Sequence, residues 1–233
     1  MGCGVLASAI CMNKPVANLI FAAHNIPHTP WFAVDRYAIE DFGYLTDKVG
    51  EYLQYPIFVK PASGGSSLGI TKVTEPAGLR QAMLLASAHD RRILLEQGVD
   101  GCEVECAVIG NNNPYATLPG EIVPCNEIYD YEAKYESGDK SALHIPARLP
   151  QEKLEEVREL ALRAYQATGC TGLARVDFFV EKGTGKVFIS EINTMPGFTD
   201  ISMYPKLMQQ LEKHTFSELL HSLVVLAVER AEQ

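Results

Sequence analysis

The chain has 233 residues, of which 47% are hydrophobic and 21% are charged; this is typical of globular proteins and too apolar for an intrinsically disordered chain. Its 29 acidic and 20 basic residues give a formal net charge of −9, which argues against nucleic-acid or anionic-membrane binding, because both need a basic surface. No stretch approaches the roughly 18 apolar residues of a membrane span, and the six scattered cysteines indicate reduced thiols, so we expect a cytoplasmic protein of one or two domains.

Helical and extended patterns alternate along the chain, which favours an α/β or α+β fold. The elements expected in the first half are a helix over residues 14–24, strands over 56–60 and 70–73, a helix over 75–88 and a strand over 93–97. Asn13 and Thr74 are the expected caps of the two helices, and Pro15 suits the first turn of the earlier one. The buried face of the second helix is expected to carry Leu79, Ala82, Met83 and Ala86.

The second half continues the alternation. Its expected elements are a strand over residues 103–109, a helix over 151–168, hairpin strands over 176–180 and 187–193, and a last helix over 216–230. Thr215 and Glu218 form a capping box at the start of the last helix. Residues 126–149 are polar, aromatic and irregular, which is typical of a functional lid or of a disordered connection.

The first motif with chemistry is the run Lys60-Pro61-Ala62-Ser63-Gly64-Gly65-Ser66-Ser67-Leu68-Gly69. Glycine lets backbone N–H groups approach a phosphate and serine hydroxyls add donors, so this run can be a phosphate-binding loop. It is not a Walker loop, because Gly-Lys-Ser/Thr is absent and a strand rather than a helix is expected next. A flexible hairpin loop explains the same residues.

The second motif is the expected hairpin, in which Arg175 and Asp177 lie on the first strand and Glu191 and Asn193 on the second. With a turn at Gly183–Gly185, Asp177 and Glu191 come opposite each other and point the same way. Two carboxylates and an amide oxygen suit hard divalent cations such as Mg²⁺. The alternative is a solvated strand face, although Asp and Asn are depleted in strands.

Two further motifs follow from local chemistry. Residues 129–135 combine three tyrosines with Lys134, and such aromatics beside a lysine can close over a nucleotide or form a packed surface loop. Gly197 follows Pro196 directly after the hairpin, where its bare backbone N–H can face a developing oxyanion or simply form a turn.

In their order along the chain, these motifs resemble those of the ATP-grasp ligases, and most closely the D-alanine–D-alanine ligases of peptidoglycan precursor synthesis. The resemblance covers nearly the whole chain, and its specific segments are residues 129–135 and 191–204. It implies an ATP-grasp fold in which two α/β subdomains clasp ATP, a central one over 13–98 and a C-terminal one over 99–233. Residues 1–12 would then be the remnant of an N-terminal domain that is otherwise missing.

The implied reaction joins two D-alanine molecules at the expense of ATP, through an acyl phosphate, and serves cell-wall synthesis and cell shape. The resemblance assigns nine residues to ATP: Lys14, Lys60, Ser66, Ser67, Glu96, Gln97, Val99, Glu103 and Lys134. It assigns two Mg²⁺ or Mn²⁺ ions to Asp177, Glu191 and Asn193. Catalysis and substrate binding are assigned to Arg175, the N–H of Gly197, Ser66, Tyr135, Ser202 and Met203.

Three alternatives remain open. A ligase that adds D-serine in place of the second D-alanine fits the same motifs, and so does another ATP-grasp carboxylate–amine ligase. The third is a non-catalytic ATP-binding fragment, because the glutamate that positions the first ammonium in the family belongs to the missing domain. On that ground the isolated chain is expected to be a strongly impaired ligase. Tyr135 fits amino-acid acceptors better than a hydroxy acid, and the family suggests a homodimer.

Overall fold

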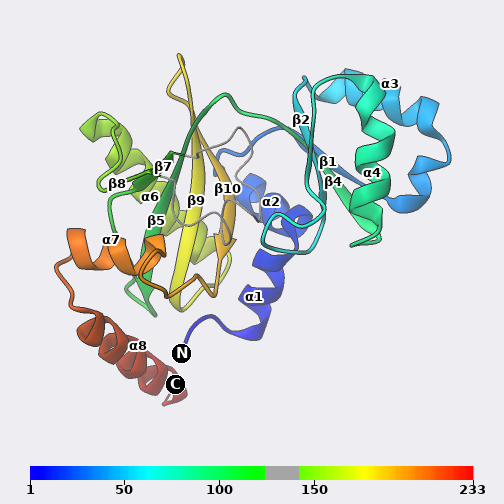
Figure 1. Cartoon of the computed structure of the whole chain (residues 1–233). Helices are drawn as coiled ribbons and strands as arrows, with labels where there is room; N and C mark the ends of the chain where they lie inside the picture. Colours follow the sequence, from blue (N-terminus) through cyan, green and yellow to red (C-terminus); the bar gives the residue numbers. More distant parts are fainter. Residues whose placement is uncertain (124–141, 233) are drawn as a thin grey trace.

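The computed structural model describes residues 1–123 and 142–232 and contains two antiparallel sheets that lie side by side (Figure 1). The smaller sheet has the order β1-β4-β2-β3 and comprises β1 (Trp31–Asp35), β2 (Ile57–Pro61), β3 (Thr71–Val73) and β4 (Arg92–Gln97). The larger sheet has the order β10-β9-β5-β7-β8, with β6 paired to β5. It comprises β5 (Gly101–Gly110), β6 (Tyr115–Ala116), β7 (Gly120–Val123), β8 (Ala142–His144), β9 (Gly172–Glu181) and β10 (Val187–Asn193).

One face of the smaller sheet is covered by helices α3 (Phe42–Tyr52) and α4 (Leu79–Ser87), each preceded by a short 3₁₀ turn, Arg36–Ile39 and Pro76–Gly78. Alternation along the strands turns apolar residues toward these helices, and the resulting core includes Leu45, Val49, Ile57, Val59, Leu79, Met83, Ile93 and Leu95. The opposite face therefore carries Phe58 and Lys60 of β2 together with Glu96 of β4, which pairs with Phe58. This polar face is turned toward the larger sheet.

The larger sheet is covered on both faces. Helix α6 (Gln151–Ala167) packs on one face against the even-numbered residues of β9, including Val176 and Phe178. Helices α7 (Met203–Leu211) and α8 (Phe216–Ala231) pack on the other face over Ile109 and Leu173. The same face also carries the charged residues Glu103, Glu105, Arg175 and Asp177, together with Phe179. Glu103 and Phe179 line the region between the two sheets.

Helices α1 (Val5–Met12) and α2 (Lys14–Ala23) connect the two halves (Figure 1). Phe21 of α2 is fully buried in the core of the larger sheet. At the other end of the helix, the cap residue Asn13 accepts a hydrogen bond from the N–H of Val16 and donates one to Ser63 Oγ in the loop of the smaller sheet. Helix α2 is thus fixed to the larger sheet by its apolar face and to the smaller sheet by its first residues.

Most of the expected elements are confirmed to within one or two residues at each end, but the strand expected over 176–180 begins earlier, at Gly172. The capping box is present, since Thr215 and Glu218 bond each other's backbone N–H groups. The helix expected over 75–88 begins later, at Leu79, because Pro76 opens a 3₁₀ turn, and Thr74 does not cap it. Helices α1, α3 and α7 and strands β1, β6 and β7 were not expected, and β8 lies within the segment expected to be irregular. Residues 126–141 of that segment lie outside the described residues.

Five cysteines fall within the described residues, and all five are free thiols, as expected from the sequence; Cys125 lies outside those residues. None of the helices in the described part of the chain is both long and apolar enough to cross a membrane.

The packing of α2 predicts that two substitutions on this helix will have very different effects on the free energy of unfolding. Phe21→Ala removes a fully buried ring from the larger core and should lower the free energy of unfolding by about 3–5 kcal/mol. Leu19→Ala is the matched control, because Leu19 is 61% exposed and its loss should change stability by about 0.5 kcal/mol or less. Urea unfolding measures both. Equal effects of the two substitutions would contradict the placement of α2 in this core.

Candidate functional site

A cavity of about 920 Å³ lies between the polar face of the smaller sheet and the charged end of the larger one, within the size range of small-molecule sites. The linker Gly98–Gly101 between β4 and β5 forms part of its wall. Nine of the residues predicted from the sequence line it: Lys14, Lys60, Ser66, Ser67, Glu96, Gln97, Val99, Glu103 and Glu191. Residues that are distant in the sequence thus line the same cavity. Lys134 and Tyr135 lie outside the described residues.

Glu96 and Lys60 form a largely buried ion pair on the smaller-sheet side of the cavity. Lys60 Nζ lies 2.5 Å from Glu96 Oε2, and the hydroxyl of Thr29 donates to Glu96 Oε1, also at 2.5 Å. Lys60 Nζ also lies 5.6 Å from the centre of the Phe58 ring. Both carboxylate oxygens of Glu96 therefore have a partner, and the lysine ammonium is held at the cavity wall beside an aromatic face.

The Gly/Ser loop joins the site through Lys14. The Lys14 ammonium donates to the carbonyl of Gly64 at 2.9 Å and lies 4.0 Å from Glu191 Oε2 of the larger sheet. Ser66 and Ser67 both have positive φ angles, 54° and 57°, which non-glycine residues rarely adopt. Such backbone strain is often found at ligand-binding segments. The loop and the start of α2 therefore bring strained serines and a lysine to the same cavity.

Carboxylates lie side by side across three strands of the larger sheet. The register pairs Asp177 with Glu105 on one side and with Glu191 on the other, which confirms the expected opposition of Asp177 and Glu191. Arg175 donates to both oxygens of Asp177 at 2.7 Å, and its Nε lies 3.0 Å from Glu105 Oε2. Burial alone would lower the pKa of Arg175, but the negative charges of Asp177 and Glu105 outweigh burial and hold that pKa well above its usual value.

The three predicted metal ligands are joined by hydrogen bonds, and Glu191 is the member of this set that lines the cavity. The amide nitrogen of Asn193 donates to Asp177 Oδ2 at 2.9 Å and to Glu191 Oε1 at 3.2 Å, so the three side chains are in direct contact. Turning the amide by 180° would direct its oxygen toward the same carboxylates. Two carboxylates and one amide oxygen fit a hard divalent cation. Within residues 1–123 and 142–232, no three His, Cys, Asp or Glu side chains are arranged to hold a metal ion. A metal site here therefore needs the Asn193 amide as its third ligand.

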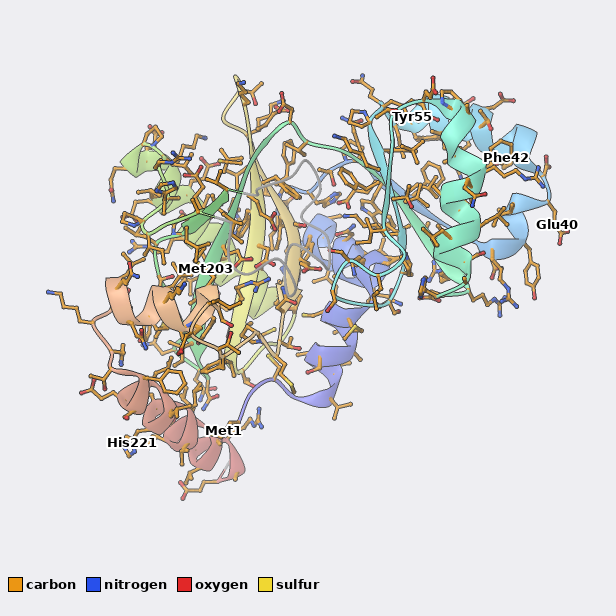
Figure 2. The ribbon with its side chains drawn as sticks, viewed as in Figure 1. Met1, Glu40, Phe42, Tyr55, Met203 and His221 are labelled. Carbon is orange, nitrogen blue, oxygen red and sulfur yellow. The ribbon has the colours of Figure 1, made fainter. Side chains whose placement is uncertain are left out.

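The predicted residues after β10 do not line the cavity. A Cβ added to Gly197 would lie 2.7 Å from Ser202 Oγ, so the hydroxyl of Ser202 closely approaches Gly197. Met203 is the first residue of α7, and its side chain is 4% exposed and packs between α7 and the larger sheet, so only its backbone is left for the predicted contact with substrate. Figure 2 shows Met203 at the start of α7, far from Tyr55, which lines the cavity beside the smaller sheet.

Several polar residues at the site were not singled out from the sequence. Thr29, Glu121 and Arg148 line the cavity, and Glu105 supports Arg175. For Glu105 a signal was present, since a second glutamate alternates with Glu103 in an otherwise apolar strand. Thr29 and Arg148 lie in irregular connections, where periodicity gives no information.

Glu121 and Arg148 form a two-pronged ion pair. Arg148 Nε and Nη2 donate to the two oxygens of Glu121 at 2.9 and 2.8 Å, and the backbone N–H of Arg148 adds a third bond at 3.2 Å. These hydrogen bonds hold the pKa of Glu121 below its usual value. The pair fixes the segment after β8 to the wall of the cavity.

Comparison with known proteins agrees with this geometry. Residues 20–225 match the family model described as "D-ala D-ala ligase C-terminus". The chain belongs to the D-alanine–D-alanine ligase family. It is 51% identical to the D-alanine–D-alanine ligase of Thermoanaerobacter sp. strain X514 over 229 residues, which are 98% of this chain and 63% of that protein. The chain therefore spans somewhat less than two thirds of the length of such relatives.

Solved structures support the same assignment. The D-Ala:D-Ser ligase of Enterococcus faecalis superposes with a TM-score of 0.86 at 36% identity, over 97% of this chain and 64% of that one. The D-alanine–D-alanine ligase of Coxiella burnetii superposes with a TM-score of 0.83 at 33% identity, over 99% of this chain and 60% of that one. The resemblance seen in the sequence and the expected ATP-grasp fold, with mixed helix and antiparallel sheet, are thereby confirmed.

The ion pair of Glu121 predicts a pH-dependent effect. A carboxylate whose pKa is lowered by folding stabilises the protein above its unfolded pKa of about 4.3, and this stabilisation is lost as pH falls through the lower folded pKa. Glu121→Gln should therefore cost about 1 kcal/mol of unfolding free energy at pH 7 and progressively less below pH 4. Denaturant unfolding from pH 7 to pH 3 measures this.

Glu156→Gln is the matched control, because Glu156 pairs with Lys153 on an exposed helix face, where ion pairs add little. If Glu121→Gln lowers the free energy of unfolding by the same amount at every pH, the proposed stabilisation by the ion pair is contradicted.

Proposed function

We propose that this chain binds MgATP in the cavity between the sheets and serves the ATP-dependent ligation of two D-alanine molecules. The observation that carries the proposal is the meeting of Lys14, Lys60 and Glu191 in one cavity, where Glu191 is joined through Asn193 to Asp177 just behind the wall. Membership in the D-alanine–D-alanine ligase family supports the substrate class. The division of the chain into two subdomains that meet at 98–101, a cytoplasmic location and a homodimer belong to the same proposal.

In this proposal the phosphates of ATP lie between Lys14, Lys60 and the Ser66–Ser67 loop, and the base lies against Glu96, Gln97 and Val99. Glu103 faces the ribose, and Lys134 adds a further charge. Lysine ammonium groups and backbone N–H groups lower the electrostatic cost of bringing a carboxylate to a polyanion. Mg²⁺ or Mn²⁺, held by Asp177, Glu191 and Asn193, would supply charge neutralisation at the transferred phosphoryl group.

The carboxylate oxygen of the first D-alanine attacks the terminal phosphorus, and ADP leaves. The amine of the second D-alanine then attacks the acyl carbon, loses a proton and expels phosphate. The tetrahedral oxygen needs hydrogen-bond donors, which Arg175 and the N–H of Gly197 provide in this proposal. Arg175 is already fixed by Glu105 and Asp177, so little reorganisation is required when charge develops. Ser66, Tyr135, Ser202 and Met203 are proposed to close and line the second-substrate site.

A second candidate is ligation of D-alanine to D-serine. The specific observation in its favour is the superposition on the Enterococcus faecalis D-Ala:D-Ser ligase with a TM-score of 0.86. The two reactions share every group discussed above and differ only in the acceptor.

Nucleotide binding is tested by calorimetric titration of the chain with ATP, with and without Mg²⁺. Lys60→Met should weaken ATP binding at least tenfold, because it removes a charge at the cavity wall and retains the aliphatic stem. Lys186→Met is the matched control and should leave affinity unchanged, since Lys186 lies beyond the cavity in the β9–β10 turn region. No binding of ATP by the wild-type chain at millimolar concentration would refute the proposal.

The acceptor is tested by measuring ADP release and dipeptide formation with D-alanine, D-serine and D-lactate in parallel. Use of D-alanine in preference to D-lactate is expected, because the attacking group in the proposal is an amine. Arg175→Lys should greatly reduce product formation while ATP still binds, since it keeps a positive charge beside Glu105 and Asp177 but loses the paired N–H donors that the guanidinium offers to the oxyanion. Product with D-lactate but not with D-alanine would contradict the role proposed for Tyr135.

A further inference from the structure

Thr29 occupies an unusual position for a polar side chain. It is 4% exposed, lies on the connection between α2 and β1, and lines the cavity. Its hydroxyl donates to Glu96 Oε1 at 2.5 Å, while Lys60 holds the other oxygen. Burying a hydroxyl is costly unless it is hydrogen-bonded, and a hydrogen bond to a charged acceptor is stronger than a neutral one.

The backbone on either side of Thr29 is attached to both sheets. The N–H of Gln97 donates to the carbonyl of Pro30 at 2.9 Å, which fixes this segment to the end of β4. The N–H of Ile189 donates to the carbonyl of Pro27 at 2.8 Å, and His28 forms an isolated bridge with Ile189, which fixes it to β10. The hydroxyl of Thr29 is therefore presented to Glu96 from a backbone that cannot easily shift.

This fixed hydrogen bond has a chemical consequence. With Oε1 of Glu96 engaged by Thr29, the orientation of the carboxylate is set, and Oε2 faces Lys60 and the cavity. A carboxylate oxygen can accept two hydrogen bonds, so Oε2 can accept a second one beside that of Lys60. An acceptor held in place attracts the 6-amino group of adenine and repels the 6-oxo group of hypoxanthine or guanine, whereas a carboxylate free to rotate discriminates less.

We propose that Thr29 is a positioning residue that orients Glu96 and thereby makes the site selective for 6-amino over 6-oxo purine nucleotides. This inference rests on the proposed function, because it requires a purine nucleotide beside Glu96. It adds a residue outside the predicted set and gives the connection between α2 and β1 a role in nucleotide choice.

The test compares MgATP with MgITP by calorimetric titration of the 233-residue chain. The two bases differ only at positions 1 and 6, where the N1 acceptor and 6-amino group of adenine are replaced by an N1–H donor and a 6-oxo group. Thr29→Val keeps the shape of the side chain and removes the hydroxyl, and Thr29→Ser is the matched control that keeps it. Thr29→Val should reduce the ratio of ATP to ITP affinity at least fivefold, as expected for losing one hydrogen bond to a charged group. Thr29→Ser should retain the wild-type ratio.

If Thr29 had a merely structural role, Thr29→Val would weaken the binding of both nucleotides equally. An unchanged ratio of ATP to ITP affinity in Thr29→Val would therefore overturn the inference. Failure of the wild-type chain to bind either nucleotide would instead refute the proposed function, and the two failures are thus distinguishable. Thermal unfolding verifies that each variant is folded. If Thr29→Val does not fold, Thr29→Ala carries the same comparison with the same expected reduction.

Discussion

The pairing of Arg175 with two buried carboxylates is the interaction on which the site depends. Glu105 and Asp177 lie on neighbouring strands of the larger sheet, and Arg175 neutralises them from a position two residues before Asp177. An uncompensated buried carboxylate would cost several kcal/mol, so this face of the sheet can be charged only because the arginine is there. Beside this pairing, Asn193 contacts both Asp177 and Glu191, so carboxylates are concentrated at the end of the larger sheet.

The second requirement is that the two sheets hold a fixed relation across the cavity. Lys14 bonds the loop of the smaller sheet and approaches Glu191 of the larger one. Phe21, on the same helix, is buried in the larger core, and the Pro27–Ile189 hydrogen bond ties the following connection to β10. Cationic groups of the smaller sheet therefore face anionic groups of the larger sheet, an arrangement that suits a polyanion bound together with divalent cations.

The sequence predicted well what depends on local periodicity. The β9–β10 hairpin follows from alternation around a glycine-containing turn, and that alternation alone placed Asp177 and Glu191 on one face. The loop with Ser66 and Ser67 and the buried stripe of α4 were predictable for the same reason. The grouping of Glu191 with Ser66 and Ser67 in one cavity required the resemblance to a family, because separations of more than 100 residues leave no local signal.

Other features could not be predicted, for identifiable physical reasons. The ion pair between Arg175 and Glu105 depends on the register of β5 with β9, strands some 70 residues apart in sequence. Thr29 contacts Glu96 because a connecting segment packs between two sheets, which no periodicity encodes. Helix α1 is apolar almost throughout, although only Ala7 and Cys11 are buried, so its sequence has no pattern that distinguishes a buried face.

The central claim, that one ligand is held by both sheets, is tested most directly by hydrogen exchange of the chain with and without MgATP. The account predicts slower amide exchange both in β2, the Gly/Ser loop and β3, and in β9 and β10, because ligand contacts would suppress local opening on both sides of the cavity. Slower exchange in only one of the two sheets, or no change in either, would contradict it.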